Sequence, residues 1–427
     1  MTPAGGLAAD DTAVVVGASL AGWRAVETLR KEGFEGTISL VGDERHLPYD
    51  RPPLSKQVLA GTWPPEKSVL ADKRRSSELR VHEVLGRRAV RLDVEGRKVE
   101  LDDGAVLDGD AIVITTGAVP RQFPGTEGLS QRDGLFTLRT LDDSLALRGA
   151  VTALESTRVV VIGAGFIGAE VASTCAGLGC RVTVLEALDV PLRNVIGPVL
   201  GAHCGSLHGA NGVELRTGVA VQGVRWGPVE GTGAGAGAGA ASGLVVDLAG
   251  GEALPADVVV VGIGVVPTTG WLADSGLTLE NGVVCDDRLF AADGIVSAGD
   301  IARWNWRHDG GEELIRIEHW QVAAEAGVAA ARSLMAGRAD APPFTPIPYF
   351  WSDQYGVRLQ VLGNPGGDDE VLVIEGSLEE GKFVALFGRA GRLRAVMAIG
   401  KPRQLMGFRV LLQAGSSWDE ALAHGRS

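Results

Sequence analysis

The segment from Arg158 to Glu186, RVVVIGAGFIGAEVASTCAGLGCRVTVLE, constrains the fold more than any other part of the chain. It opens with the β-branched run Val159–Ile162, which is typical of a buried parallel strand. Glycines follow with the spacing G-x-G-x-x-G, and then come apolar residues at helical spacing, a second apolar strand and an acidic residue. This order predicts a strand, turn, helix and strand that together bind a dinucleotide.

Each glycine of this turn has its own physical role. Gly163 permits the tight turn, Gly165 lets a pyrophosphate approach the backbone, and Gly168 lets the helix pack against the strand. The helix N-terminus adds N–H donors and the positive end of the helix dipole. Glu186 would accept the ribose hydroxyls, and its charge would repel a 2′-phosphate, so the unit is predicted to prefer NAD over NADP.

A second unit of the same kind occupies residues 12–43. Its pattern predicts a strand over Ala13–Val16, a turn over residues 17–22, a helix that ends near Glu32, and a strand over Thr37–Val41. Two such units predict either two nucleotide sites, or one site and a copy that has lost it.

The turn of this second unit departs from the usual pattern at Ser19, which stands in place of the middle glycine. The serine hydroxyl is able to donate to a phosphate, but the turn could equally serve only to cap the helix. Asp43 ends the second strand and is the candidate for the ribose hydroxyls, with Glu44 as the alternative.

Two similar segments indicate how the domains are connected. Val113–Pro120 and Val260–Pro267 are each an apolar strand followed by G-x-x-P, and we interpret them as the places where the chain leaves and re-enters a domain. The predicted domains are a first nucleotide-binding domain over residues 11–120 and 256–325, a second inserted over residues 121–255, and a C-terminal α+β domain over residues 326–427.

Two further segments complete this organisation. Residues 231–243, GTGAGAGAGAASG, lie between two strand-like runs and predict a flexible extension of a hairpin. In the C-terminal domain, short strand patterns are followed by a helix predicted from Pro402 to about Ala414.

The bulk properties exclude several classes of function. A formal net charge of −13 disfavours nucleic acid or an anionic membrane as the main partner. No apolar run approaches a membrane span, and the first ten residues lack the features of a signal peptide, so a cytoplasmic location is predicted. The cysteines show no zinc-binding spacing, and no metal site is expected; they are Cys175, Cys180, Cys204 and Cys285.

The segment His46–Lys56, HLPYDRPPLSK, carries charges within a rigid loop. Its prolines exclude a regular strand or a helix interior, and rigid loops of this kind often hold functional residues. The alternative is a solvated turn.

Together, the motifs VVVGASLAG, LPYDRPPLSK, VVVIGAGFIGAE, SAGD, RIEHW and YFWSDQYGVRLQVLG resemble those of the FAD- and NADH-dependent ferredoxin reductases that supply oxygenases, the putidaredoxin reductase and biphenyl dioxygenase reductase type. The resemblance covers about residues 12–415. It implies an α/β, glutathione-reductase-like fold with FAD, NAD and C-terminal domains. It also implies that hydride passes from NADH to FAD, and that single electrons then pass to a [2Fe–2S] ferredoxin serving a monooxygenase or dioxygenase.

The same resemblance assigns binding residues. Asp43 would hold the FAD ribose, Asp300 the ribityl chain, and Trp320 would lie at the pyrimidine edge of the flavin. The residues implied for FAD are Gly17, Ala18, Ser19, Leu20, Ala21, Gly22, Asp43, Arg51, Lys56, Val90, Thr116, Gly117, Arg139, Gly299, Asp300, Glu318, His319 and Trp320. Those implied for NAD are Gly163, Gly165, Phe166, Ile167, Gly168, Glu170, Glu186 and Gly264.

Lys56 and Glu170 are the implied catalytic residues. A buried ammonium beside the flavin would stabilise the negative charge of its reduced form, and a buried ammonium needs a carboxylate partner. Glu170 matches the position of that partner, although a glutamate near a helix start is also stabilised by the helix dipole alone. The stretch from Asp43 to Lys56 lacks the cysteine pair of disulfide reductases, which implies direct electron transfer to an external acceptor.

Other functions are consistent with the same motifs. One is a small-molecule reductase, such as a monodehydroascorbate-reductase-like protein or an NADH oxidase, and another is an interaction module like apoptosis-inducing factor. An acidic ferredoxin would need a local positive patch on this acidic chain. The candidate docking residues are Lys73, Arg74, Arg75, Arg403 and Arg409, with the aromatic run Tyr349, Phe350 and Trp351.

Overall fold

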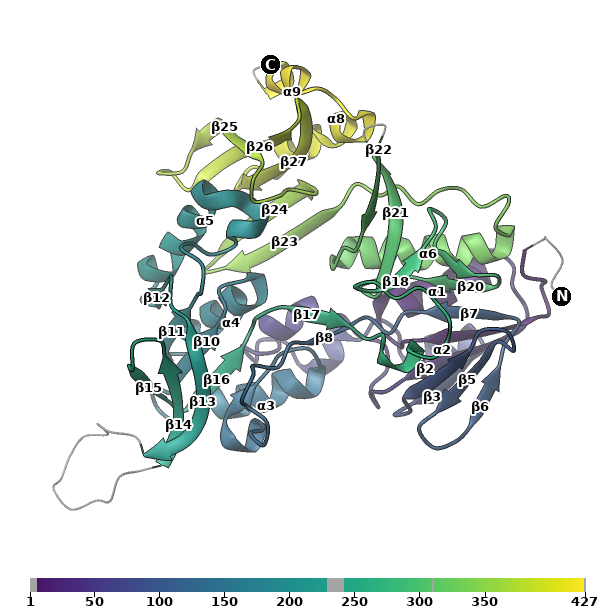
Figure 1. Cartoon of the computed structure of the whole chain (residues 1–427), viewed down its shortest axis with the longest axis horizontal. Helices are drawn as coiled ribbons and strands as arrows, with labels where there is room; N and C mark the ends of the chain where they lie inside the picture. The colour runs from purple at the N-terminus through teal and green to yellow at the C-terminus, as the bar shows by residue number, and fades with distance from the viewer. Residues whose placement is uncertain (1–5, 229–241, 309–310, 426–427) are drawn as a thin grey trace. The chain divides into compact units, whose positions relative to one another are not determined.

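The computed structural model describes residues 6–228, 242–308 and 311–425, and these form two compact units (Figure 1). Unit 1 consists of Met1–Asp50, Ser68–Val119 and Val266–Phe350, and unit 2 consists of Arg51–Lys67, Pro120–Val265 and Trp351–Ser427. The three predicted domains are a finer division than these two units, and their boundaries stay a prediction.

Unit 1 is built on a six-stranded sheet in the order β19-β20-β7-β1-β2-β3. The strands are β1 (Thr12–Val16), β2 (Thr37–Gly42), β3 (Val81–Leu85), β7 (Ala111–Ile114), β19 (Phe290–Ala292) and β20 (Ile295–Ser297). All neighbours run parallel except β19, which is antiparallel to β20. The first predicted strand, helix and strand are therefore confirmed.

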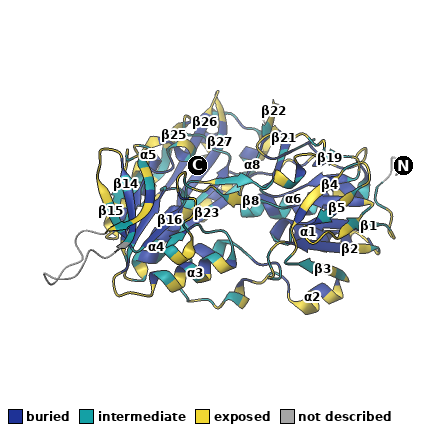
Figure 2. Ribbon diagram, turned by 60° about the horizontal axis from the view of Figure 1, so that its bottom comes forward, coloured by how far each residue is buried: buried dark blue, intermediate teal, exposed yellow. Residues whose placement is uncertain are grey.

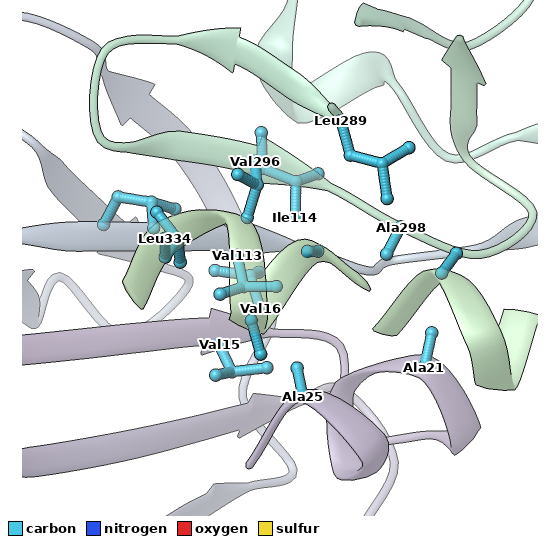
Figure 3. Close-up of a cluster of buried hydrophobic side chains, with 14 of the residues drawn as sticks. Val15, Val16, Ala21, Ala25, Val113, Ile114, Leu289, Val296, Ala298 and Leu334 are labelled. Atoms are coloured by element: carbon cyan, nitrogen blue, oxygen red, sulfur yellow. The ribbon is translucent and has the colours of Figure 1, made fainter. Parts of the chain in front are cut away.

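Helices α1 (Leu20–Lys31) and α6 (Trp320–Ala336) pack against this sheet and against each other. Figure 3 shows the shared core, to which β1 contributes Val15, β7 contributes Val113 and α1 contributes Ala25. A Cβ atom at Gly327 would lie 2.2 Å from the Ala21 carbonyl oxygen, so only glycine permits this close approach of the two helices. The α1–β1 turn is thus held against a rigid layer.

The rest of unit 1 consists of small elements. Their bounds are α2 (Lys73–Glu78), β4 (Ala89–Asp93), β5 (Lys98–Leu101), β6 (Val106–Asp108), β18 (Val283–Cys285), β21 (Ala302–His308), β22 (Gly311–Ile315) and the 3-10 turn η4 (Gly270–Leu272). Strands β4 to β6 form one three-stranded sheet, and β18, β21 and β22 form another.

Unit 2 contains an all-parallel sheet in the order β12-β11-β10-β16-β9. Its strands are β9 (Leu135–Phe136), β10 (Arg158–Ile162), β11 (Arg181–Leu185), β12 (Glu214–Arg216) and β16 (Val258–Val261). Its helices are α3 (Leu141–Val151), α4 (Phe166–Gly177) and α5 (Arg193–Ala210). Strand β10 lies between β11 and β16, and Val159–Ile162 are all buried, which explains its uninterrupted β-branched run. The neighbouring strand β16 is likewise buried, as Figure 2 shows.

A separate antiparallel sheet in unit 2 contains β13 (Val221–Pro228), β14 (Ser242–Leu248) and β15 (Ala253–Ala256). Strands β13 and β14 pair as a hairpin, as the sequence predicts. The predicted loop over 231–243 falls outside the described residues, except that β14 already begins at Ser242.

The C-terminal sheet has the order β23-β24-β27-β26-β25. Its strands are β23 (Tyr349–Gln354), β24 (Val357–Gly363), β25 (Glu370–Ser377), β26 (Lys382–Arg389) and β27 (Arg392–Ile399), and its helices are α7 (Pro402–Gly407), α8 (Arg409–Ala414) and α9 (Trp418–Gly425). The helix predicted over 402–414 is confirmed in its outer bounds, but it is divided into α7 and α8 at Phe408, which has φ −80° and ψ −6° and a buried side chain.

The remaining short elements lie at connections. They are β8 (Ala118–Pro120), β17 (Val265–Pro267), and the 3-10 turns η1 (Pro52–Ser55), η2 (Pro65–Ser68) and η3 (Gln131–Asp133). The chain passes between the units within β8 and β17, which are the ends of the two similar G-x-x-P segments. No helix in the described part of the chain is long and apolar enough to cross a membrane.

His208 of α5 is buried beside the turn between β23 and β24. Its Nδ1 atom lies 2.7 Å from the Tyr355 hydroxyl. Burial lowers the pKa of His208 to about 4, so the folded protein holds this imidazole in its neutral form at pH 7.

This buried histidine predicts a specific loss of stability in acid. In the unfolded chain the imidazole binds a proton near pH ~6.5. In the folded chain it stays neutral until the pH approaches 4. Between these values the unfolded chain binds more protons, so the free energy of unfolding decreases as the pH falls from ~6.5 toward 4. The full effect is about 3 kcal/mol. In His208→Gln, the decline in urea-unfolding free energy between pH ~6.5 and ~4.5 should be smaller than in the wild type. His82→Gln, at an exposed position of β3, is the control, and equal declines in all three proteins would contradict the assignment.

Candidate functional site

The glycines in the turn of unit 2 differ in whether the fold itself requires them. Gly163 has φ 101°, and a Cβ there would lie 2.5 Å from the Gly262 carbonyl oxygen. A Cβ at Gly168 would lie 2.1 Å from the Gly163 carbonyl oxygen. Gly165 is different: its φ of −70° suits any residue, and the nearest atom to an added Cβ is the Gly262 oxygen at 3.9 Å. Packing within the protein therefore does not require glycine at position 165.

Gly165 stands at the start of α4. Gly165 is the N-cap of the helix, no side chain caps it, and the first turn of α4 has no acidic residue. Backbone N–H groups and the positive helix end are therefore available to an anion. This geometry fits the pyrophosphate of a dinucleotide, and we keep the predicted role of the turn as a proposal.

Gly165→Ala tests this proposal because it adds one methyl group where only a ligand would meet it. The thermal midpoint should change by no more than about 2 °C, while the KM for NADH should rise about tenfold or more. Gly168→Ala is the contrasting variant, since its methyl group clashes with the backbone and should destabilise the fold itself. An unchanged KM in a folded Gly165→Ala protein would contradict the predicted approach of the pyrophosphate.

Glu186 lies directly beside this turn. Its Oε2 accepts from the Ala164 N–H at 2.8 Å, and its Oε1 accepts from the Leu188 N–H at 2.9 Å. The two backbone donors fix the carboxylate at the end of β11, next to the residues that would hold a pyrophosphate. This position of the Glu186 carboxylate agrees with its predicted role as the acceptor of the ribose hydroxyls. That role stays a prediction.

The turn of unit 1 has the same construction. A Cβ at Gly17 would lie 2.2 Å from the Thr115 carbonyl oxygen, and one at Gly22 would lie 2.0 Å from the Gly17 oxygen. Ser19, the N-cap of α1, has extended backbone (φ −128°, ψ −161°) and makes no side-chain capping bond. Since α1 also begins without an acidic residue, this turn too fits an anionic ligand despite the serine.

Asp43 does not occupy the position that Glu186 has in unit 2. The Gly17 N–H bonds the Val41 oxygen as the Gly163 N–H bonds the Leu185 oxygen, so the structural counterpart of Glu186 is Gly42. A Cβ at Gly42 would lie 2.6 Å from the Ala18 Cβ, which leaves no room for a side chain there. Asp43 is exposed one residue further on, and the alternative acid, Glu44, accepts from the Tyr49 hydroxyl.

Lys56 and Glu170 form a buried ion pair within unit 2, so the pairing predicted for them is confirmed. Lys56 Nζ lies 3.0 Å from Glu170 Oε1, and the two side chains are 12% and 3% exposed. The Ser352 hydroxyl donates to Oε1 at 2.7 Å, and the Ser55 hydroxyl donates to Oε2 at 2.5 Å. Specific partners, and not the helix dipole alone, thus hold the carboxylate. The catalytic roles of the pair remain proposals.

Helix α4 also positions the two segments that carry these partners. Thr174 donates from its hydroxyl to the Ser55 carbonyl oxygen at 2.7 Å, and Ser173 accepts from the Tyr355 N–H at 2.7 Å. Gln354 donates to the Ser352 hydroxyl oxygen at 3.1 Å. Sequence reasoning missed Ser55, Ser352 and Gln354, and the one available signal was the polar run Ser352–Gln354 inside a strand pattern.

In unit 1, the start of α6 is tied to the proline-rich loop. The Trp320 indole N–H donates to Asp50 Oδ1 at 2.7 Å. Burial raises the pKa of Asp50, and the bond from Trp320 opposes that rise. His319 caps the helix and packs on Phe350, with ring centroids 4.5 Å apart. Burial lowers the pKa of His319 to about 4, opposed by the Asp300 carboxylate.

Arg316 links two more of the predicted residues. It contacts Glu318 Oε1 at 2.6 Å and donates to the Asp300 carbonyl oxygen at 2.9 Å. From the sequence, Asp50 counts among the charges of the rigid loop and Arg316 belongs to the RIEHW motif, but neither was assigned a binding role. Through these contacts, Arg316 of the RIEHW motif holds that motif beside the SAGD motif in unit 1.

The other predicted residues are placed as follows. In unit 1, the Thr116 hydroxyl, next to Gly117 in the chain, donates to the Thr268 carbonyl oxygen and accepts from the Trp271 indole N–H. Gly299 lies against Ala21. Val90 on β4 is 43% exposed. In unit 2, Arg51 donates to the Arg139 carbonyl oxygen at 2.6 Å, and Gly264 accepts from the Arg121 N–H. The predicted FAD residues Arg51, Lys56 and Arg139 belong to unit 2, whereas the others belong to unit 1. Their roles toward FAD stay predictions.

Two glycine-turn nucleotide folds and a buried lysine–glutamate pair are the features expected of an oxidoreductase that uses two nucleotides. Residues 11–327 match the family model described as pyridine nucleotide-disulphide oxidoreductase, and residues 349–426 match the model described as reductase C-terminal. The chain belongs to the pyridine nucleotide-disulphide oxidoreductase family.

Its curated relatives align over almost their full length. The ferredoxin reductase component of chlorobenzene dioxygenase from Cupriavidus sp. (strain PS12) is 37% identical over 414 residues, which cover 95% of this chain and 93% of the relative. Rhodocoxin reductase from Rhodococcus erythropolis is 35% identical over 400 residues, which cover 93% of this chain and 88% of the relative.

Solved structures agree. The putidaredoxin reductase–putidaredoxin covalent complex matches with a TM-score of 0.87 and 31% identity, over 96% of this chain and 94% of that chain. The ferredoxin reductase for the CYP199A2 system from Rhodopseudomonas palustris matches with a TM-score of 0.84 and 31% identity, over 96% of both chains. The resemblance and the fold class predicted from the motifs are confirmed.

Proposed function

We propose that this chain is an NADH-dependent ferredoxin reductase that supplies electrons to a monooxygenase or dioxygenase through a [2Fe–2S] ferredoxin. The observation that carries the proposal is the match over 95% of the chain to the ferredoxin reductase component of a dioxygenase. The two glycine turns and the buried ion pair are the structural features that this activity needs.

The residues present fit the two nucleotides. The turn over Gly17–Gly22 is proposed to hold the FAD pyrophosphate, and the turn over Gly163–Gly168 that of NADH, with Glu186 on the ribose. When bound, FAD takes two electrons from NADH as a hydride and releases them one at a time to a one-electron acceptor.

The proposed task of the ion pair is electrostatic. Lys56 keeps a positive charge in a buried position, where charge stabilisation is stronger than in water. Glu170 holds the Lys56 ammonium in one place, and Ser55 and Ser352 hold Glu170. Since no cysteine lies between Asp43 and Lys56, no disulfide at that position takes part in the reaction, and the electrons leave directly for the external acceptor.

Steady-state turnover with different acceptors tests the proposal. The purified protein should contain FAD, and its kcat/KM for a [2Fe–2S] ferredoxin should exceed that for dioxygen, a quinone or ascorbyl radical by about tenfold or more. A preference for dioxygen would make it an NADH oxidase, and a preference for ascorbyl radical would make it a monodehydroascorbate reductase. Either result would overturn the proposal.

The structure modifies the predicted docking residues. On α2, Arg74 lies 3.2 Å from Glu78 and Arg75 lies 3.6 Å from Glu27, so the basic run Lys73–Arg75 is partly neutralised by its neighbours. Phe350 is buried against His319, so the prediction that it forms part of an apolar docking contact is wrong. Arg403 on α7 is exposed, and Arg409 on α8 is partly exposed.

Among these, Arg403 is the better candidate for docking. Arg403→Glu should raise the KM for ferredoxin about threefold to tenfold without changing flavin reduction by NADH, because a rim charge acts mainly on encounter. Added salt should weaken ferredoxin turnover, but not dye reduction, in the wild type. Arg74→Glu is the comparison. If neither salt nor either reversal affects the ferredoxin reaction, the docking face lies elsewhere. We also propose a cytoplasmic location, whose reducing conditions suit the four free cysteines.

A further inference from the structure

Two cysteines meet at the C-terminal end of α4. The Cys180 N–H donates to the Cys175 carbonyl oxygen at 3.1 Å, and the Gly179 N–H donates to the Ala176 carbonyl oxygen at 3.0 Å. Gly179 has φ 85°, so the helix ends in a Schellman turn. This turn brings together the side chains at the two positions that Cys175 and Cys180 occupy, where a hydrophobic contact is usual.

The two thiols have different surroundings. Cys175 is fully buried in the core of unit 2, whereas Cys180 is partly exposed at its edge, where its thiol lies 3.5 Å from the Val151 carbonyl oxygen. Their mutual interaction is the largest influence on both: it lowers the pKa of Cys180 and raises the pKa of Cys175. The accessible thiol is therefore the one that forms a thiolate more readily, and the buried thiol lies next to it.

We propose that Cys175 and Cys180 are a site of reversible oxidation, at which hydrogen peroxide converts the two thiols into an intramolecular disulfide. The accessible Cys180 sulfur attacks a peroxide oxygen, so that an S–O bond forms, the O–O bond breaks and the leaving oxygen departs as water. Cys175 then attacks the Cys180 sulfur, so that the S–S bond forms and the second oxygen leaves as water with the Cys175 proton. The two sulfurs together give two electrons to the peroxide.

This site is separate from the proposed electron path. It lies at the opposite end of α4 from the glycine turn, beyond Glu170 and Ser173. It is also distinct from the position after the first nucleotide unit at which disulfide reductases carry their cysteine pair, because that stretch has no cysteine here.

The chain contains internal controls for the test. Cys204 is 1% exposed, and burial raises its pKa to about 12. Cys285 is 4% exposed, and burial raises its pKa as well. Both should therefore stay reduced at peroxide concentrations that oxidise the Cys175–Cys180 pair.

The experiment treats the FAD-loaded protein with increasing hydrogen peroxide in the absence of NADH, blocks remaining thiols with N-ethylmaleimide under denaturing conditions, and maps the peptides by mass spectrometry. We expect a loss of about 2 Da from the Cys175–Cys180 peptide, reversed by dithiothreitol, with Cys204 and Cys285 alkylated. In Cys175→Ser, Cys180 should accumulate as sulfenic or sulfinic acid that dimedone or a mass gain reveals. In Cys180→Ser, Cys175 should remain a thiol.

Because the wild-type protein gives the decisive measurement, the test does not depend on the folding of either variant. The proposal is overturned if Cys175 and Cys180 stay alkylatable at peroxide levels that already oxidise Cys204 or Cys285. It is also overturned if Cys180 of the wild type stops at sulfinic acid without forming the cross-link.

Discussion

Glu170→Ala is expected to lower the free energy of unfolding by about 3–5 kcal/mol, because it leaves the buried Lys56 ammonium without its counter-charge. The carboxylate is 3% exposed and accepts from Lys56, Ser55 and Ser352, so its removal also strands two hydroxyl donors. Urea unfolding at pH 7, followed by fluorescence, measures the change.

Three matched variants separate charge from packing. Glu170→Gln keeps the volume and acceptor but not the charge, and it should cost less than Glu170→Ala. Lys56→Met should cost less again, because Ser55, Ser352 and the Asp353 N–H still bond the carboxylate. The double change Lys56→Met with Glu170→Leu should recover part of the loss, since an apolar pair often replaces a buried ion pair. A loss below about 1 kcal/mol in Glu170→Ala would contradict the importance of the pair.

The same variants test the proposed function. Lys56→Met should retain FAD but slow its reduction by NADH about tenfold or more, since each tenfold corresponds to about 1.4 kcal/mol of lost charge stabilisation. Stopped-flow absorbance of the flavin measures this rate. Reduction at the wild-type rate would show that Lys56 does not act on the flavin.

Glu186→Ala is expected to lower kcat/KM for NADH about 10-fold to 100-fold, and to raise the ratio of NADPH to NADH efficiency. The first effect follows from the loss of a charge-assisted acceptor for the ribose, and the second from the loss of a charge that repels a 2′-phosphate. Initial rates of flavin reduction with each nucleotide provide both numbers.

The controls for this prediction address the turn itself. Glu186 also accepts from the Ala164 and Leu188 N–H groups, so Glu186→Gln, which keeps an acceptor oxygen, should disturb the turn less while still relaxing nucleotide choice. Glu214→Ala, which removes an exposed acid from the neighbouring strand β12, should leave both efficiencies unchanged. An unaltered NADPH to NADH ratio in both Glu186 variants would exclude the ribose assignment.

Much of the architecture was predictable from local patterns. In both nucleotide units, glycine spacing and strand and helix periodicity operate within about thirty residues, so strand, turn and helix are specified by neighbours along the chain. Gly168 is required by a contact with the Gly163 carbonyl oxygen inside that same short segment, and Gly163 by its own φ of 101°, which is why their roles were readable in advance. The pairing of Lys56 with Glu170 was predicted from the resemblance to a family, together with the cost of an unpaired buried charge.

Other features depend on contacts between distant parts of the chain. Ser55 and Ser352 are separated from Glu170 by 115 and 182 residues, and no local pattern marks two serines as its donors. Gly42 stands where unit 2 has its acidic residue, and Ala18, which is distant in sequence, fills the space that a side chain at Gly42 would need. Phe408 interrupts the C-terminal helix while its side chain is buried, although its local sequence is compatible with a continuous helix.

The cysteine pair combines, within one short segment, a feature specified by local sequence and a feature decided by tertiary packing. The sequence places Cys175 and Cys180 five residues apart, and side chains at that spacing are not neighbours on the surface of a straight helix. The Schellman turn at Gly179 brings them together, and packing in the core of unit 2 buries one thiol while leaving the other accessible. At this turn, local chemistry determines where the helix ends, whereas packing in the core decides which thiol is buried and which is accessible.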